Sequence, residues 1–247
     1  MRVPLAYGDE IHVMTSGAFT APYQEVVPAF ERTTGHKVVT AFGASMGNAP
    51  DSIPVRLQHG EPADVVILAA EALDELVKQG KVVAGSRVDL VRSRIGMAVR
   101  AGAPKPDISS LAAFTRAVLA ARSIAYSASA SGTYLSTELF PRLGIAEQIR
   151  AKSRRIESER VGAVVARGDA EIGFQQISEL LPVPGIEIVG PLPDGAQRVT
   201  TFSAGVATRA AHPQAAKALI QYLASPAIFP TLHKDGLEPA RAGVHQP

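Results

Sequence analysis

Short apolar stretches alternate with helical patterns along the whole chain, and this alternation predicts the fold class. The stretches that we interpret as strands are 11–15, 38–42, 65–69, 94–100, 124–127, 171–175, 186–189 and 199–206. The segments that we interpret as helices are 22–33, 54–59, 71–79, 110–121, 133–143, 146–152 and 160–167, with two more that begin at Pro213 and at Ser225-Pro226. Strands separated by crossover helices form parallel sheets covered by helices, so the pattern predicts an α/β fold.

The 247 residues correspond to about 1.6 domains of ordinary size. The sequence contains no low-complexity linker between its halves. We therefore expect two lobes, each a mostly parallel sheet flanked by helices, joined by two strand hinges at 94–100 and 199–206. Lobe 1 would be discontinuous, with residues 1–93 and 207–247, and lobe 2 would comprise residues 94–206, with a ligand cleft between them.

Composition removes several classes of function. The chain has 46% hydrophobic residues and a formal net charge of +2. It contains no cysteine, and this absence excludes disulfides, thiolate metal sites and cysteine nucleophiles. The six histidines are scattered, and neither a metal-binding spacing nor a glycine-rich dinucleotide motif is present, so we expect no metal and no cofactor. The densest basic run, 150–160, also contains Glu157 and Glu159, so we expect no nucleic-acid partner.

No apolar run reaches the eighteen or so residues that a membrane span needs. The segment Met1–Glu10 has no apolar central stretch and no small-residue cleavage site, so we do not expect it to be a signal peptide. The location is then periplasmic if a signal peptide was removed, and otherwise cytoplasmic. We expect a monomer.

Three segments share one design, in which a strand ends in small hydroxyl or glycine residues and a helix follows. They are Thr15-Ser16-Gly17-Ala18, Gly43-Ala44-Ser45-Met46-Gly47 and Ser127-Ala128-Ser129-Ala130-Ser131-Gly132-Thr133. In an open α/β sheet the carboxyl ends of the strands face the binding crevice, and helix N-termini there favour an anion. Serine adds an uncharged donor, and glycine lets a ligand approach the backbone. The segments predict a shared site for a small anion; the alternative is that each serine only caps its helix.

A fourth segment, Gly168–Gln176, predicts a turn and then a strand that ends in two amides. Since successive side chains of a strand alternate between faces, we expect one of Gln175 and Gln176 to face the ligand. The full set of residues that we expect to bind the anion is Ser16, Gly17, Ser45, Met46, Ser129, Ser131, Gly132, Thr133, Gln175 and Gln176.

The segment Gly43-x-Ser45-x-Gly47 also fits the nucleophile elbow of serine hydrolases, with His212 or His233 as the base. Pro50 and Pro54 interrupt the helix that normally follows such an elbow, which disfavours this alternative.

Seven stretches together resemble the periplasmic molybdate-binding proteins of ABC transporters. They are Thr15-Ser16-Gly17, Val27-Pro28-Ala29-Phe30-Glu31, Thr34-Gly35, Phe42-Gly43-Ala44-Ser45, Gly60-Glu61-Pro62-Ala63-Asp64-Val65, Gly168-Asp169-Ala170-Glu171-Ile172-Gly173 and Gly236-Leu237-Glu238-Pro239-Ala240. The resemblance implies a two-lobe, type II periplasmic-binding-protein fold in which serine hydroxyls, backbone N–H groups and a tyrosine hold an oxyanion. It also implies ABC-transporter membrane subunits as partners. By position, Ser16 and Ser45 match the serine ligands, and the loop around Ser129 and Ser131 matches a backbone contact.

The second half departs from that family. Where the family commonly has Gly-Ile-Val-Tyr, this chain reads Gly173-Phe174-Gln175-Gln176, so the tyrosine ligand is absent. Ser129-Ala130-Ser131-Gly132 and Gln175-Gln176-Ile177-Ser178-Glu179-Leu180 are similar to the aconitate isomerase branch of the same fold. The resemblance therefore implies two functions.

Our leading interpretation is a solute-binding protein that captures a small oxyanion or carboxylate for an ABC transporter. The alternative is an isomerase that interconverts cis- and trans-aconitate by proton abstraction and return, which needs a general base. His59, Tyr126 and Tyr134 are conceivable proton carriers, and Arg56 and Arg160 are conceivable sources of positive charge. No motif singles out one of them as catalytic.

Overall fold

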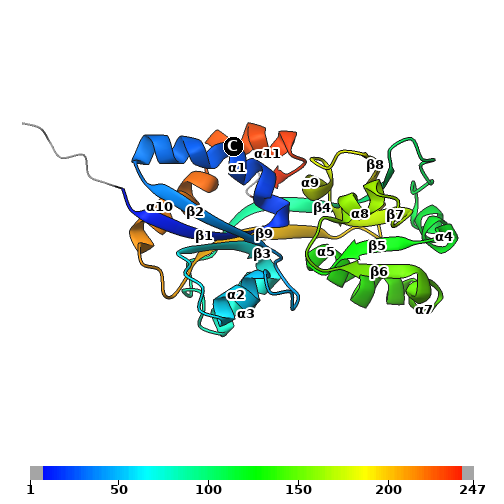
Figure 1. The fold of residues 1–247 in the computed structure, drawn as a ribbon, viewed down its shortest axis with the longest axis horizontal. Coiled ribbons are helices and arrows are strands. Elements are labelled where there is room, and N and C mark those ends of the chain that lie inside the picture. The colour runs from blue at the N-terminus through cyan, green and yellow to red at the C-terminus, as the bar shows by residue number, and fades with distance from the viewer. Residues whose placement is uncertain (1–7, 241–247) are drawn as a thin grey trace, which may run out of the picture. The chain divides into compact units, whose positions relative to one another are not determined.

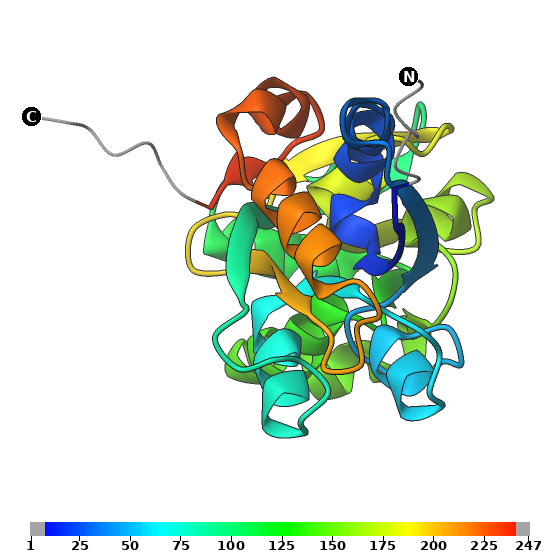
Figure 2. The same ribbon diagram turned by 90° about the vertical axis from the view of Figure 1, so that its left-hand side faces the viewer.

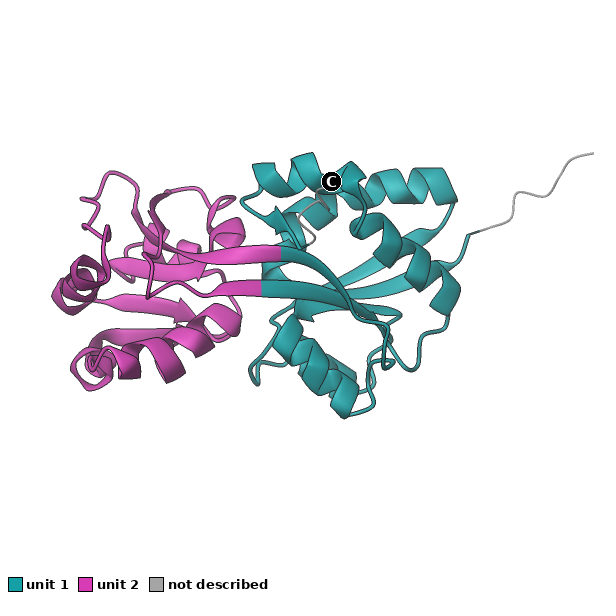
Figure 3. Cartoon of the chain, turned by 180° about the vertical axis from the view of Figure 1, so that it is seen from behind, with its two compact units in different colours: residues 1–91, 201–247 teal, residues 92–200 magenta. Residues whose placement is uncertain are grey.

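Helices and strands alternate along the chain, as Figure 1 and the turned view in Figure 2 show. The computed structural model describes residues 8–240, so most of the segment 1–10 lies outside the described residues. The chain divides into two compact units: unit 1 contains residues 1–91 and 201–247, and unit 2 contains residues 92–200 (Figure 3). Each unit has its own sheet and its own apolar core.

Unit 1 contains a mostly parallel sheet with helices on both faces. Its elements are β1 (Glu10–Ser16), α1 (Gly17–Thr34), β2 (Lys37–Gly43), α2 (Ile53–Gln58), β3 (Val65–Ala69), α3 (Ala70–Lys78), the start of β4 (Val88–Arg100), most of β9 (Val199–Val206), α10 (Pro213–Leu223), η3 (Pro226–Ile228), α11 (Phe229–Lys234) and β10 (Glu238–Pro239). The strand order is β2-β1-β3-β9; the first three are parallel, and β9 is antiparallel to β3. Helices α1, α10 and α11 lie on one face and α2 and α3 on the other (Figure 1), which buries every residue of β3.

Unit 2 repeats this arrangement with shorter elements. They are the rest of β4, α4 (Leu111–Ala120), β5 (Ile124–Ser127), α5 (Ala130–Tyr134), η1 (Leu135–Leu139), α6 (Phe140–Arg142), α7 (Ala146–Ile149), η2 (Arg150–Lys152), β6 (Ser153–Ile156), α8 (Val161–Ala166), β7 (Ile172–Gln176), α9 (Ile177–Leu180) and β8 (Ile186–Pro191). Strands β6, β5 and β7 are parallel, and β4 pairs antiparallel with both β7 and β8. Phe114, Phe140 and Phe174 pack edge-on in its core.

Most predicted strands and helices are present, and the main differences lie at the starts of two helices, at the start of β4, which begins at Val88 rather than Arg94, and at one short strand. The first helix begins at Gly17 rather than near Pro22, because its first turn buries Ala18 and Phe19. The predicted helix 133–143 begins instead at Ala130 and contains a π-helical turn, Leu135–Leu139, just before Pro141. The prediction missed β6, a four-residue edge strand with two exposed arginines.

Candidate functional site

Two of the predicted serines lie at the same edge of the unit 1 sheet. Ser16 is the last residue of β1, and Ser45 follows the end of β2, which is parallel to β1. The Ser45 hydroxyl accepts a hydrogen bond of 2.9 Å from the backbone N–H of Ala69, at the end of β3. The carboxyl ends of three parallel strands therefore meet around these two residues.

The Ser16 hydroxyl is buried and has no hydrogen-bond partner among the described residues. Its side chain is 2% exposed, and its Oγ atom makes no hydrogen bond with the part of the chain that the structure describes. Ser16 occupies the N-cap position of the 18-residue helix α1 without a side-chain capping bond. A buried hydroxyl without a partner costs free energy. Capping therefore does not explain this serine, whereas a ligand at the N-terminus of α1 would satisfy it.

The loop that carries Ser45 and Met46 is closed by its own hydrogen bonds. Ser52 donates to the Gly47 carbonyl at 3.1 Å, and the Ile53 N–H donates to the Ala44 carbonyl at 3.0 Å. Helix α2 begins only at Ile53, so the strand–turn–helix geometry of a hydrolase elbow is not formed at Ser45. Met46 is partly buried in this loop.

The corresponding loop of unit 2 lies at the carboxyl end of β5. The hydroxyls of Ser127 and Ser131 are 3.1 Å apart, and either can donate to the other. A Cβ on Gly132 would lie 1.7 Å from the Ser127 carbonyl oxygen, so only glycine allows α5 to approach the strand this closely. Ser129 holds the N-cap position of α5 without a side-chain capping bond, and both it and Thr133 are partly buried.

Both predicted glutamines are buried at the neighbouring carboxyl end of β7. The Gln175 amide accepts from the Val161 N–H at 2.9 Å and donates to Glu179 at 3.1 Å. Gln176 accepts from the Ser93 hydroxyl at 2.7 Å. The two amides thus have partners within unit 2, and a contact of either with a ligand stays a prediction.

Sequence reasoning did not single out Glu179. Its carboxylate is partly buried, and burial raises its pKa to about 7, although Arg160, Gln175 and the Gln176 backbone oppose the shift. The only sequence signal for Glu179 is its position, four residues after Gln175 and just beyond the end of a predicted strand. That position does not reveal that the carboxylate is buried. A carboxyl group that titrates near neutral pH can both take up and release a proton.

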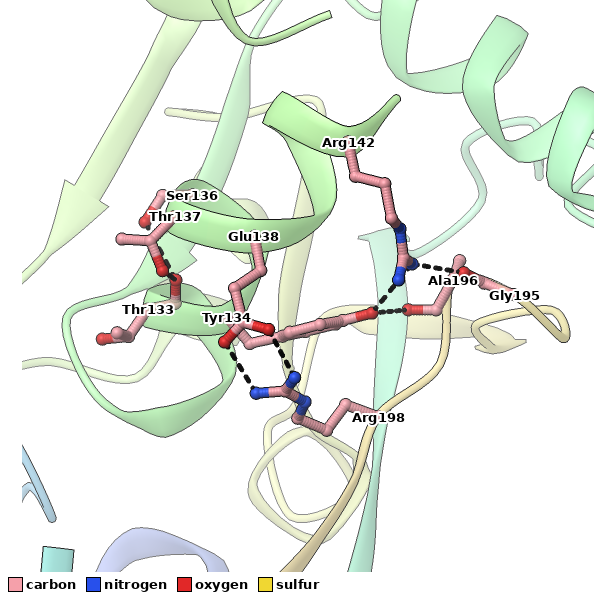
Figure 4. Close-up of polar contacts among 9 residues, drawn as sticks. All are labelled: Thr133, Tyr134, Ser136, Thr137, Glu138, Arg142, Gly195, Ala196 and Arg198. Atoms are coloured by element: carbon pink, nitrogen blue, oxygen red, sulfur yellow. Dashed lines mark hydrogen bonds and ion pairs between the residues drawn. The ribbon is translucent and has the colours of Figure 1, made fainter. Parts of the chain in front are cut away.

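The helix after the unit 2 serine loop is firmly anchored to residues 195–198, as Figure 4 shows. The Tyr134 hydroxyl donates to the Ala196 carbonyl at 2.9 Å, and the Arg198 guanidinium lies 4.3 Å from the centre of the tyrosine ring. Arg198 also forms an ion pair with Glu138. The Tyr134 hydroxyl is therefore engaged in a structural hydrogen bond to the backbone and is a poor candidate for proton transfer.

The other conceivable groups are also occupied or remote from the strand ends. Arg56 pairs with Glu61 at 2.7 Å, and His59 is exposed after the last turn of α2. The Tyr126 ring packs against Phe140. Residues 8–240 contain no cluster of three or more side chains suited to a metal ion. In the same range, every helix is too short or too polar to cross a lipid bilayer.

Comparisons with known proteins agree over most of the chain. The sequence profile described as bacterial extracellular solute-binding protein matches residues 11–238. Aconitate isomerase from Pseudomonas sp. is 52% identical over 230 residues, which cover 93% of this chain and 88% of the relative. The molybdate-binding protein ModA from Azotobacter vinelandii is 29% identical and covers 90% of this chain and 86% of its own length.

The same fold occurs among solved structures. The periplasmic molybdate-binding protein of Azotobacter vinelandii superimposes with a TM-score of 0.71 at 23% identity, covering 92% of this chain and 98% of its own. This likeness confirms the predicted fold class, the type II periplasmic-binding-protein fold.

Proposed function

Because the chain belongs to the bacterial extracellular solute-binding protein family, we propose that it binds a small polycarboxylate and interconverts cis- and trans-aconitate. The observation that carries the proposal is the 52% identity, over 93% of the chain, with a protein named aconitate isomerase. We further propose that binding takes place in a cleft between the two units and that the protein acts in the periplasm.

The site chemistry supports a carboxylate ligand. Each unit presents a serine-bearing loop at the carboxyl ends of its strands, and Ser16 brings a buried hydroxyl that has no partner within residues 8–240. Uncharged donors and helix N-termini stabilise negative charge in a site that excludes water. A tricarboxylate carries more charge than these donors balance. Arg160, which has no ion-pair partner among the described residues, is the cation that we assign to it.

A second candidate function is transport without chemistry. The 29% identity with a molybdate-binding protein and the match of Ser16 and Ser45 to the serine ligands favour an oxyanion carrier that would deliver its ligand to ABC-transporter membrane subunits. The end of β7 argues against molybdate, since Gln176 stands there in place of the tyrosine ligand.

One experiment separates the two functions. A ligand at a hundred times its dissociation constant stabilises a protein by about 2.7 kcal/mol, which raises Tm by roughly 5–10 °C for a chain of this size. We expect that shift with cis- and trans-aconitate and not with molybdate. Chromatography should then show trans-aconitate forming from the cis isomer in the presence of the protein. A shift with molybdate alone, or binding of aconitate without turnover, contradicts the isomerase.

A further inference from the structure

Glu179 is the carboxylate of unit 2 whose surroundings fit proton transfer. It lies in α9, directly after the carboxyl end of β7. Strand β7 is parallel to β5, so this end of β7 lies at the same sheet edge as the Ser127–Gly132 loop. Glu179 is therefore at the edge where the donors of unit 2 gather.

The carboxylate is held in place by a short relay of hydrogen bonds. Gln175 donates its amide N–H to Glu179 at 3.1 Å, and the Gln175 oxygen is fixed by the Val161 N–H at 2.9 Å, the first residue of α8. The backbone N–H of Gln176 also bonds to the carboxylate. These contacts orient Glu179 through neutral donors and leave its charge without an ion-pair partner at salt-bridge distance among the described residues.

Asp64, a carboxylate that is more fully buried than Glu179, has a structural role. Asp64 accepts from the backbone N–H groups of His12 and His212 at 2.8 and 2.9 Å, which ties β1 to the segment before α10. Most exposed carboxylates of unit 2 pair with arginine or lysine; Glu171, for example, pairs with Arg122. Arg160 is the charged group that acts on Glu179, and it lowers the pKa of that carboxyl less than burial raises it.

We propose that Glu179 is the acid–base residue of the isomerisation, an assignment that rests on the proposed function. The Glu179 carboxylate removes a proton from the methylene carbon of aconitate, and the electrons of that C–H bond form the new double bond to the central carbon. The electrons of the former double bond move to its outer carbon, where the adjacent carboxylate stabilises them as an enolate. The Glu179 carboxyl returns the proton to that carbon, so the base is regenerated and no oxidant or reductant is consumed.

The test compares E179Q and E179D with a matched control, E171Q, which removes a carboxylate at the opposite end of β7. Turnover of cis-aconitate and the affinity for trans-aconitate by calorimetry are measured on each full chain. We expect E179Q to lose at least about a hundredfold in kcat, as for other general acid–base residues. Its affinity should stay within about tenfold, E179D should retain part of the activity, and E171Q should behave as the wild type. For the wild type, kcat should rise with pH through about 7, and this limb should be absent from the residual activity of E179Q.

Solvent isotope exchange adds a readout that a structural role would not change. In D2O the wild type should exchange the methylene protons of aconitate, and E179Q should not. If E179Q keeps turnover within about threefold of the wild type, or loses affinity as much as turnover, the assignment of Glu179 is wrong while the isomerase stands. If the wild type itself does not turn over aconitate, the proposed function fails and the assignment fails with it.

Discussion

Buried polar side chains differ in whether the fold itself satisfies them. The Ser203 hydroxyl donates to Asp89 at 2.7 Å, and Asp64 accepts from two backbone N–H groups, so both stabilise unit 1 directly. The Ser16 hydroxyl has no such partner among residues 8–240, and Glu179 accepts hydrogen bonds from neutral groups while Arg160 acts on its charge from beyond salt-bridge distance. Groups that the fold leaves incompletely satisfied are the ones that a ligand or a proton can use.

Stability should depend on pH through Glu179. Burial raises its pKa from 4.5 to about 7, so the folded state holds this proton over a pH range in which the unfolded state has lost it. The stability gained at low pH is therefore lost as pH rises from about 4.5 to 7, by at most roughly 3 kcal/mol. E179Q should remove this dependence, so its stability relative to the wild type should be higher at pH 8 than at pH 5. Urea unfolding at pH 5 and pH 8 measures the free energy of unfolding of the wild type and E179Q, with E171Q as the control. If the difference between E179Q and the wild type is the same at both pH values, Glu179 titrates normally.

At this scale the sequence predicts which residue types line the strand ends but not their burial. The serines at 16, 45 and 131 follow from strand–loop–helix patterns, and the structure places 16 and 45 at one edge. The importance of Glu179 depends on its burial and on Gln175, whose amide is fixed by Val161 at the start of α8, an element that is separate from Glu179 in sequence and comes near it only in the fold.

At the scale of elements, each of two serine loops depends on a glycine that lets the backbone approach itself closely. Gly132 makes this possible in unit 2, where the Ser127 carbonyl fills the space of a side chain. In unit 1 the loop between β2 and α2 folds back in the same way, since a Cβ on Gly43 would lie 1.9 Å from the Asp51 carbonyl oxygen. Both contacts are with backbone atoms, which cannot rotate away.

We expect Gly132→Ala to destabilise the protein by about 2–3 kcal/mol or more, because α5 must move away from β5 to admit the methyl group. Aconitate binding should weaken as well, since the movement displaces Ser131. Gly162→Ala is the matched control: its Cβ would meet only side-chain atoms of Val183 and Ile186, at 3.1 Å, so it should cost less than G132A. Denaturant unfolding and calorimetry test both; equal stability of G132A and the wild type would mean that α5 is not tightly packed.

Apolar periodicity predicts elements well where one face is buried. Residues 65–69 and 199–206 were assigned with their observed bounds, since both are strands with extensive burial. The start of α1 was misplaced because Pro22 is typical of a first turn, yet packing of Phe19 and Tyr23 keeps it inside the helix. The π-helical turn at 135–139 lies before Pro141, which has no N–H to donate, and single-sequence patterns do not distinguish such a turn from an α-helix.

At the scale of the whole molecule, two strands cross the boundaries between the units. Strand β4 crosses at residues 91 and 92, and β9 crosses at residues 200 and 201 (Figure 3). Each unit places its serine loop after strands of its own sheet. The proposed function requires one anion to contact the serine loops of both units, and substitutions in each unit test this.

If one anion contacts both units, substitutions in either unit should weaken its binding. Ser16→Ala in unit 1 and Ser131→Ala in unit 2 should each weaken the binding of aconitate by about tenfold to a hundredfold, because each removes a hydrogen bond to a charged ligand. S16A should leave the free energy of unfolding within about 0.5 kcal/mol of the wild type, since it deletes a hydroxyl that has no hydrogen-bond partner in the described part of the chain. Ser86→Ala and Ser123→Ala, which each remove a hydroxyl that accepts from a backbone N–H away from the loops, serve as controls in units 1 and 2 and should bind as the wild type does. Calorimetric titration of the four variants tests this: if the serine of only one unit affects the affinity, the proposal that both units contact the anion is wrong.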